Sequence, residues 1–274
     1  MHDTPEGNLI ADAVPAASVA ALACRGLTVA VPGRVLVAGL ELAVGQGRLV
    51  GVLGENGSGK TLTLHTLAGL RAPSSGRVRL FGGLLDAAPR RHRARRLGLL
   101  AQHDADPFPS TVLESALIGR HPHVDFWRWE SAEDVRLARA ALERVDLAGL
   151  EQRAVATLSG GERRRLALAT VLTQDPDIYL LDEPLNHLDP HHQLDVLRLF
   201  RAETRNGKLV FASLHDVNLA AQFTDDVLLL FGNGEWRFGA SAAVLSQGNV
   251  SRLYRMPVEQ IEAGGRRIFL AASA

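Results

Sequence analysis

The sequence has very little lysine and cysteine, few aromatic residues, and no excess of charge of either sign. Among its 30 basic residues only Lys60 and Lys208 are lysines, and 30 acidic residues bring the formal net charge to zero. A neutral chain does not bind nucleic acid through bulk electrostatics, because that mode needs a basic excess. We therefore expect no nucleic-acid partner.

The 274 residues are 46% hydrophobic and 22% charged, which is ordinary for a globular protein and excludes general disorder. The length suits one large domain or two lobes. A single cysteine, Cys24, cannot form an intramolecular disulfide, which is typical of a reducing compartment. No run approaches about 18 consecutive apolar residues, so we expect no transmembrane helix.

The N-terminal segment is rich in alanine and proline. We expect residues 1–22 to form a flexible tail, and regular structure to begin near Leu27. The residues that end at Cys24 look faintly like a lipoprotein cleavage site. Acidic residues stand where a signal peptide carries positive charge, however, and Pro15 interrupts the apolar run, so we do not interpret this segment as a signal peptide.

Apolar runs and helical periodicity alternate along the rest of the chain. The patterns predict strands at Leu49–Leu53, Val78–Phe81, Leu97–Ala101, Ile178–Leu181 and Leu209–Ser213, and helices at Lys60–Ala68 and Gln193–Ala202. Strands that alternate with helices favour an α/β fold with a parallel sheet. Between residues 111 and 172 the pattern is helical, so we expect this part to be inserted into the α/β core.

Turn and capping signals add local detail. Two segments, Val227–Phe231 and Glu235–Phe238, are separated by Gly-Asn-Gly and predict a β-hairpin. Ser131 and Asp134 resemble a capping box at a helix start. The glycines after Ala263 indicate a small closing hairpin near the C-terminus.

One segment fits the phosphate-binding loop, with a strand before it and a helix after it. It reads Gly54-Glu55-Asn56-Gly57-Ser58-Gly59-Lys60-Thr61. Glycines let the backbone curl so that its N–H groups point at phosphates, and the helix N-terminus adds partial positive charge. Lys60 would reach the β- and γ-phosphates, and the Thr61 hydroxyl would ligate Mg²⁺. The alternative, a glycine-rich turn without a ligand, is disfavoured by the full pattern in this context.

Two acidic residues, Asp182 and Glu183, follow the strand predicted at Ile178–Leu181. A strand end beside a phosphate loop is the place for a magnesium-associated Asp182, and Glu183 can polarise a water against the γ-phosphate. Acidic residues also end strands as solvated loop starts. The pair therefore indicates a nucleotide site only in combination with the phosphate loop.

A third motif is Leu158-Ser159-Gly160-Gly161-Glu162, ahead of a helix that we expect to begin near Arg163. Free N–H groups, a hydroxyl and the lack of bulky side chains make such a helix start an anion site. Taken alone, the motif could equally be a capped helix start. We call residues 158–162 the signature segment.

With these motifs the chain resembles the ATP-binding subunits of ABC transporters over about residues 25–250. The resemblance implies a RecA-like phosphate-loop core with an antiparallel β portion, and an ATPase domain over 23–274 with a helical subdomain at about 103–170. It implies ATP hydrolysis with ATP and Mg²⁺ bound, and it adds Leu62 to the nucleotide-binding residues of the phosphate loop.

The resemblance assigns further positions one by one. Gln102 corresponds to the glutamine that ends a strand, Asp189 to a loop that contacts the partner copy, and His215 to the switch histidine at the γ-phosphate. Glu183 and His215 would then be catalytic. Gln102, Asp189 and residues 159–162 would bind the nucleotide, and the metal ligands would be Thr61, Gln102 and Asp182.

The resemblance also implies partners. In the family, ATP lies between Lys60 of one subunit and Ser159 of a second copy, in a head-to-tail, two-fold dimer. Transmembrane permease subunits would be direct partners, and a periplasmic or surface substrate-binding protein an indirect one. The chain would be a peripheral protein at the cytoplasmic face of the cell inner membrane.

Two segments, 107–123 and 185–192, are similar to importers of iron chelates, haem and cobalamin, so we expect a cargo of that class. The alternative is a soluble ABC ATPase that transports nothing, such as an iron–sulfur cluster assembly subunit. The resemblance of the segment at 107–123 disfavours this alternative.

The chain departs from the family at Val31, which stands where an aromatic residue usually stacks on adenine. An aliphatic contact there would replace stacking on the base, so the resemblance does not extend to the selectivity for adenine or the affinity for ATP. Several exposed-looking histidines raise the question of metal binding, but loop histidines without further ligands are more often solvated. They are His121, His123, His187, His191 and His192.

Overall fold

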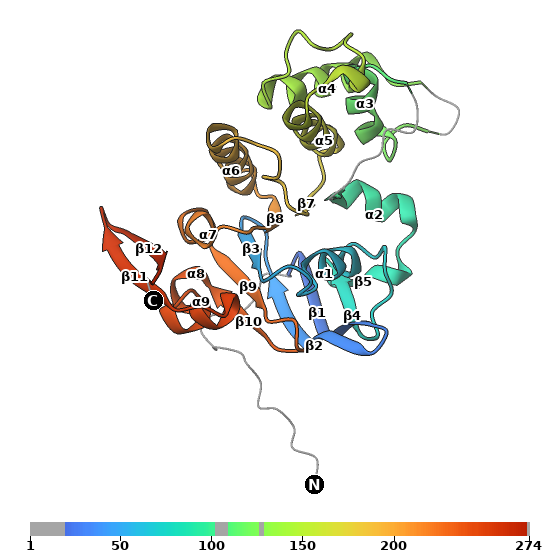
Figure 1. Ribbon diagram of the computed structural model, residues 1–274. Helices are drawn as coiled ribbons and strands as arrows, with labels where there is room; N and C mark the ends of the chain where they lie inside the picture. Colours follow the sequence, from blue (N-terminus) through green and yellow to red (C-terminus); the bar gives the residue numbers. More distant parts are fainter. Residues whose placement is uncertain (1–19, 102–108, 126–128, 273–274) are drawn as a thin grey trace.

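The computed structural model describes residues 20–101, 109–125 and 129–272 (Figure 1). Its centre is a six-stranded sheet with the strand order β10-β9-β3-β8-β7-β6. These strands are β10 (Trp236–Ala240), β9 (Asp226–Leu230), β3 (Leu49–Leu53), β8 (Leu209–Ser213), β7 (Ile178–Leu181) and β6 (Leu97–Leu100). All neighbours pair in parallel except β10, which pairs antiparallel with β9 at one edge.

The central strands are mostly apolar because both faces of the sheet are covered. In β3, Val50 and Val52 join one core cluster while Leu49 and Leu53 join the other. Every residue of β3, β7, β8 and β9 is buried. The strand predictions at Leu49–Leu53, Ile178–Leu181 and Leu209–Ser213 are confirmed, as is the α/β fold class.

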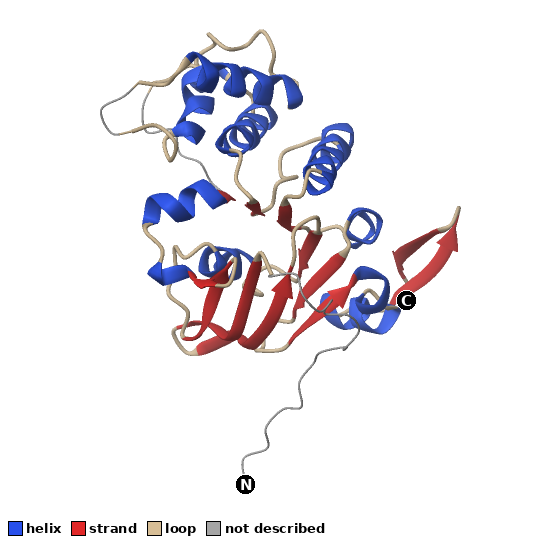
Figure 2. Ribbon diagram, turned by 180° about the vertical axis from the view of Figure 1, so that it is seen from behind, coloured by secondary structure: helices blue, strands red, loops and turns tan. Residues whose placement is uncertain are grey.

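A second, antiparallel sheet lies against one face of the first. Its order is β2-β1-β4-β5, with β2 (Arg34–Val44), β1 (Leu22–Val31), β4 (Ser75–Leu80) and β5 (Gly83–Leu84). Helix α1 (Lys60–Leu67) contributes Leu64 and Leu67 to the core cluster that both sheets share. The phosphate-loop helix is therefore packed between the two sheets, as Figure 2 shows from behind.

Regular structure begins at Leu22, so the prediction that it begins near Leu27 is wrong. The backbone N–H of Ala21 donates to the carbonyl of Val44, and β1 pairs with β2 on one side and β4 on the other. Alanine has a weak strand propensity, and the partners on both sides override it. Of the tail predicted at 1–22, residues 1–19 lie outside the described part of the chain.

The chain between β6 and β7 is helical in its described parts. It contains α3 (Val112–Leu117), η2 (Ile118–Arg120), α4 (Ala132–Arg144), η3 (Val155–Thr157) and α5 (Gly160–Gln174). These helices gather at the top of Figure 1, beyond the ends of the sheet strands. Helices α3, α4 and α5 each begin with a capping box, including the one predicted at Ser131 and Asp134.

Helix α2 (Arg90–Arg96), preceded by η1 (Leu85–Ala87), fastens the helical part to the core. Arg91 and Arg95 both donate to the carbonyl of Pro122, at 3.0 and 2.7 Å, and Arg96 pairs with Asp177 at 2.9 Å. Three arginines of α2 therefore make contacts with other parts of the chain.

The rest of the chain returns to the core. Helix α6 (Pro190–Arg205) precedes β8, and α7 (Val217–Phe223) follows it. The predicted hairpin is present as β9 and β10. After α8 (Ser241–Val244) and α9 (Gln247–Tyr254), the predicted C-terminal hairpin forms from β11 (Val258–Ala263) and β12 (Arg266–Ala271), and it projects from the body in Figure 1. No described helix is both long and apolar enough to span a bilayer.

Candidate nucleotide-binding site

The candidate site lies at the carboxyl ends of neighbouring parallel strands. The phosphate loop follows β3, His215 follows β8, and Asp182 and Glu183 follow β7, and these strands are adjacent in the order β3-β8-β7. Carboxyl ends of parallel strands meet at one edge of a sheet, which is where α/β proteins bind ligands. The fold thus brings together motifs that are more than a hundred residues apart in sequence.

The phosphate loop needs glycine at two positions for different reasons. A Cβ on Gly54 would come within 2.4 Å of the Ser58 hydroxyl and 2.6 Å of the Leu230 carbonyl, so the loop closes on itself only without a side chain there. Gly59 caps α1 with φ of 105°, a conformation that L side chains rarely adopt. Both glycines keep the loop tight, with its N–H groups free to face an anion.

Lys60 is almost completely buried at the first position of α1. Its Nζ donates to the carbonyl of Gly54 at 2.8 Å and to that of Glu55 at 3.2 Å. Burial lowers the pKa of the ammonium, and the negative charges of Glu183 and Asp182 oppose that shift. The lysine is thus a cation held inside the loop, where phosphate oxygens would compete for the same N–H donors.

Asp182 is fully buried and only half satisfied. Its Oδ1 accepts a hydrogen bond from the Ser213 hydroxyl at 2.8 Å. Its Oδ2 has no hydrogen-bond partner among the described residues. A buried carboxylate oxygen without a partner is costly unless a cation or water completes it, and Mg²⁺ prefers oxygen ligands. The unpaired oxygen of Asp182 therefore fits a magnesium ligand.

Glu183 is buried and held from several sides. Its backbone has φ of 49°, in the left-handed region that non-glycine residues avoid. Its backbone N–H donates to the Ser213 hydroxyl at 2.6 Å, and its carboxylate accepts from Asn186 Nδ2. His215 Nε2 lies 3.0 Å from Glu183 Oε1. The carboxylate is thus oriented before any ligand binds.

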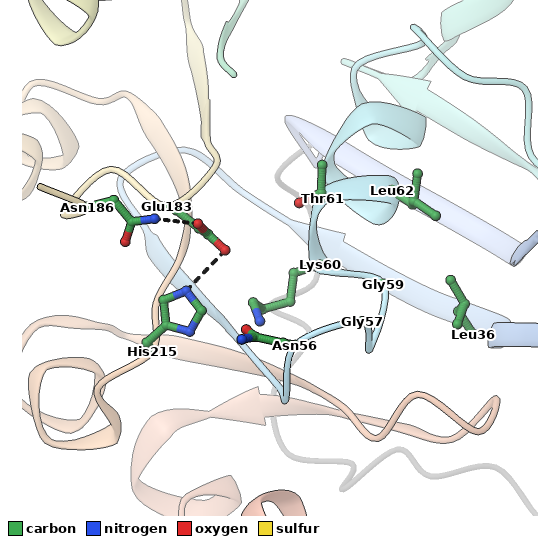
Figure 3. Close-up of a pocket in the computed structure, with 10 residues that line it drawn as sticks. All are labelled: Leu36, Asn56, Gly57, Gly59, Lys60, Thr61, Leu62, Glu183, Asn186 and His215. Atoms are coloured by element: carbon green, nitrogen blue, oxygen red, sulfur yellow. Dashed lines mark hydrogen bonds and ion pairs between the residues drawn. The ribbon is translucent and has the colours of Figure 1, made fainter. Parts of the chain in front are cut away.

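These groups line one pocket of about 420 Å³ (Figure 3). Glu183, Asn186 and His215 face Asn56 and Lys60 in that view. The described lining is Leu36, Asn56, Gly57, Gly59, Lys60, Thr61, Leu62, Glu183, Asn186 and His215. An anion-binding loop and an oriented carboxylate therefore share one cavity, an arrangement suited to hydrolysis of a phosphoanhydride.

The signature segment lies elsewhere in the same copy of the chain. None of its residues belongs to the described lining of this pocket. Helix α5 begins at Gly160, so the prediction of a start near Arg163 is wrong. Ser159 is the N-cap: its hydroxyl accepts from the Glu162 N–H at 3.2 Å, and Glu162 Oε2 accepts from the Ser159 N–H at 2.7 Å. This capping box lets a helix start on two glycines despite their low helix propensity.

Gly161 of the signature segment has a close neighbour that leaves little room for a side chain. A Cβ on Gly161 would lie 3.2 Å from the carbonyl of His187, in the loop before α6. Asp189 in the same loop is the N-cap of α6, and its side chain accepts from the His192 N–H at 3.0 Å. Neither the signature segment nor Asp189 is among the described residues that line the pocket of the phosphate loop. Gln102 lies outside the described residues.

Two residues that sequence reasoning missed connect these parts. Ser213, the last residue of β8, contacts both Asp182 and Glu183. Arg164 on α5 donates to the carbonyls of Ala101, at 2.9 Å, and of Glu183, at 2.8 Å. In the sequence, Ser213 stands out as a polar residue at the end of an apolar strand, and this could have marked it as a site residue. Nothing in the run of arginines after Glu162 distinguished Arg164.

The described histidines do not gather into a metal site. Within the described ranges no group of three or more His, Cys, Asp or Glu side chains is placed to hold a metal ion. His192 contacts Asp189 at 2.7 Å and His123 contacts the carbonyl of Gln174 at 2.9 Å, so both have local partners.

Comparison with known proteins gives consistent matches. A family model described as "ABC transporter" matches residues 37–186. The hemin import ATP-binding protein HmuV of Rhodopseudomonas palustris is 39% identical over 232 residues, which cover 82% of this chain and 84% of that protein. The hemin import ATP-binding protein HmuV of Nocardia farcinica is 38% identical over 253 residues, 90% of this chain and 87% of that protein.

Solved structures match over nearly the whole chain. A chain from an inward-facing metal-chelate type ABC transporter superposes with a TM-score of 0.79 at 26% identity, covering 93% of this chain and 98% of that one. A dimeric bacterial ABC transporter cassette superposes with a TM-score of 0.72 at 24% identity, covering 80% of this chain and 98% of that one, a likeness of fold alone.

Proposed function

Because the chain belongs to the ABC transporter family, as an ATP-binding subunit, we propose that it powers the import of haem or a related iron chelate through separate membrane subunits. The observation that carries the ATPase part is the convergence of Lys60, Glu183 and His215 on one pocket. The cargo class rests on the hemin import relatives and on the metal-chelate transporter of similar structure.

The phosphate loop would bind the triphosphate through its backbone N–H groups. Lys60 would exchange the carbonyls of Gly54 and Glu55 for β- and γ-phosphate oxygens, which are stronger acceptors because they are charged. Thr61, Asp182 and Gln102 would hold Mg²⁺, which when bound screens the negative charge of the phosphates.

Glu183 would accept the proton of the attacking water as a general base. His215 contacts the same carboxylate at 3.0 Å, so a shift of its loop moves the group that orients Glu183. Asn186 holds the other carboxylate oxygen. The Asn186 contact supports a base that is held in place. The His215 contact would let the γ-phosphate change the orientation of that base.

A second copy of the chain would complete the site. The signature segment forms the N-terminal start of α5, and none of its residues belongs to the described lining of the pocket in its own copy. We infer a head-to-tail dimer in which the signature segment of one copy covers the nucleotide held by the phosphate loop of the other. Permease subunits in the inner membrane, and indirectly a substrate-binding protein, complete the proposed transporter.

The test is uptake by the chain reconstituted with its membrane subunits in liposomes that contain ATP. We expect hemin uptake to depend on ATP, and Glu183→Gln to lower both hydrolysis and uptake by about 100-fold or more, because the amide cannot accept the proton. Glu133→Gln, an exposed change on α4, is the matched control and should behave as the parent.

Three results would contradict the proposal or one part of it. Hydrolysis by Glu183→Gln at the parent rate would remove Glu183 as the base. Co-purification of the chain with soluble assembly factors, in place of membrane-spanning subunits, would favour the iron–sulfur assembly alternative. Hydrolysis without hemin uptake would leave the ATPase intact and reject the cargo class.

A further inference from the structure

The end of helix α9 lies against both halves of the nucleotide pocket. Tyr254 is the last residue of α9 and Arg255 is its C-cap. The first contacts the loop that carries His215, and the second contacts the phosphate loop. Neither residue lies in a motif that sequence analysis singled out, and neither lines the pocket itself.

The Tyr254 hydroxyl donates to the backbone carbonyl of His215 at 3.0 Å. Burial raises the pKa of the tyrosine to about 12, with a smaller contribution from the charge of Asp216. The phenol therefore keeps its proton at physiological pH and remains a donor. The bond fixes the backbone of the residue whose imidazole contacts Glu183.

The Arg255 guanidinium pairs with the Glu55 carboxylate at 3.0 Å. Glu55 is an acidic residue inside a loop built to bind an anion, so its charge would oppose a triphosphate. The arginine neutralises that charge from outside the loop. Its backbone is left-handed, with φ of 52°, which turns the chain back after α9 and sets the direction of this side chain.

Helix α9 is held in place by packing and by hydrogen bonds of the hairpin that follows it, so its last residues can fix the loops that they contact. Val250 and Leu253 on its inner face are buried in the core cluster that also contains Leu214 and Val217, on either side of His215. The hairpin that follows is tied to α7 by a pair of hydrogen bonds, from Asn218 Nδ2 to the Phe269 carbonyl at 3.1 Å and from the Phe269 N–H to Asn218 Oδ1 at 2.7 Å.

We propose that Tyr254 and Arg255 are positioning residues for ATP hydrolysis: Tyr254 sets the His215 loop, and Arg255 neutralises Glu55 so that the phosphate loop accepts the triphosphate. The inference rests on the proposed ATPase function. The end of helix α9 would then act on the nucleotide site in two ways. Tyr254 affects the rate of ATP hydrolysis, and Arg255 affects the affinity for ATP.

The first experiment tests the rate effect with Tyr254→Phe, which removes the hydroxyl and keeps the ring. At saturating ATP, the full-length variant should hydrolyse ATP about 2- to 10-fold more slowly than the parent, the equivalent of one lost hydrogen bond. KM for ATP should be unchanged because the phosphate loop is untouched, and the thermal midpoint should fall by no more than the loss of one hydrogen bond allows. An unchanged kcat would overturn the role of Tyr254.

The second experiment tests the affinity effect with a double-mutant cycle on Arg255 and Glu55. Arg255→Ala should weaken ATP binding about 2- to 5-fold, the range of an exposed ion pair, measured by displacement of a fluorescent nucleotide. Glu55→Gln in the same chain should restore the parent affinity, since it removes the charge that Arg255 neutralises. Arg255→Lys should retain most of it.

Arg252→Ala is the matched control because Arg252 lies on the same helix, pairs with Glu235 and stacks over Phe231, and neither partner belongs to the described pocket lining. It should match the parent in kcat and affinity. Equal affinities of Arg255→Ala and its Glu55→Gln double variant would overturn the role of Arg255. Failure of the parent itself to bind or hydrolyse ATP would reject the proposed function rather than this inference.

Discussion

Glu183 combines an unfavourable backbone conformation with a fully enclosed side chain. Its φ of 49° costs free energy on the order of 1 kcal/mol, and such strain persists only where the surroundings enforce it. Here the enforcing contacts are the Ser213 hydroxyl at its N–H and the Arg164 guanidinium at its carbonyl. Both contacts fix the strained backbone of Glu183, whose carboxylate lines the pocket. This is the orientation that a general base needs.

Val31 is the residue that we expect at the place where the family usually has an adenine-stacking aromatic side chain. It ends β1, pairs with Arg34 across the turn to β2, and is partly buried against the core cluster of α1. Arg34 in turn donates to the carbonyl of Gly232 at 2.7 Å, close to Ser58 of the phosphate loop. The turn thus lies beside the phosphate loop and presents an aliphatic surface.

We predict that Val31→Tyr strengthens ATP binding about 2- to 10-fold, because an aromatic ring adds a stacking contact with adenine. Competition with a fluorescent nucleotide measures the change. Binding of inorganic tripolyphosphate should stay at the parent value, since it has no base. Val35→Tyr, an exposed change in the same hairpin, serves as the control. An unchanged affinity for ATP would mean that the base does not reach residue 31.

At the scale of elements, the stability of the helical part depends on the capping boxes at the starts of its helices. Asp134 closes the capping box of α4 through the Ser131 hydroxyl and N–H, and it also pairs with Arg120 at 2.7 Å. The hydrogen bonds from Ser131, followed by the charge of Arg120, hold the pKa of Asp134 at about 2 against an ordinary value of 3.8. The ionised carboxylate therefore links α4 to the preceding turn η2.

We expect Asp134→Asn to lower the free energy of unfolding by about 1 kcal/mol at neutral pH, as loss of a helix cap does. Because the folded-state pKa is depressed, the contribution of Asp134 is present above about pH 4 and disappears as the pH falls through about 2. Urea unfolding across that range measures it, with Glu143→Gln on the exposed side of α4 as the control. A constant difference down to pH 2 would contradict the argument.

At the scale of the whole molecule, one copy of the chain holds only part of a nucleotide site. The phosphate loop and the catalytic candidates share a pocket, whereas Ser159 and Asp189 begin helices α5 and α6 outside its described lining. A helix start that lies outside the described pocket lining of its own copy is consistent with use in trans. The two-fold dimer proposed for this family gives it that use.

We predict that Glu183→Gln forms a stable dimer when ATP is added, measured by light scattering after gel filtration. Adding Ser159→Arg should abolish the dimer and leave ATP binding by the monomer intact, because a bulky side chain blocks only the surface that covers the partner's nucleotide. Arg198→Ala on the exposed face of α6 is the control. Loss of monomer binding in the Ser159 variant would instead place Ser159 in the site of its own copy.

The sequence by itself determined the local structure and the chemistry of the motifs. Strands β3, β7 and β8 were predictable because their apolar runs report burial on both faces, and the phosphate loop because its glycines, Lys60 and Thr61 are adjacent in the chain. The start of β1 at Leu22 and of α5 at Gly160 were not, because pairing partners and a capping box override weak intrinsic propensities.

Only the tertiary structure decided which distant residues meet. Ser213, Arg164, Tyr254 and Arg255 act through contacts with residues far away in sequence, and no local pattern encodes such a contact. The scarcity of lysine shows the same division. The sequence singles out Lys60 among many arginines, and the fold supplies the reason: a compact ammonium on a flexible stem fits a buried loop whose carbonyls accept its protons, where a planar guanidinium would not.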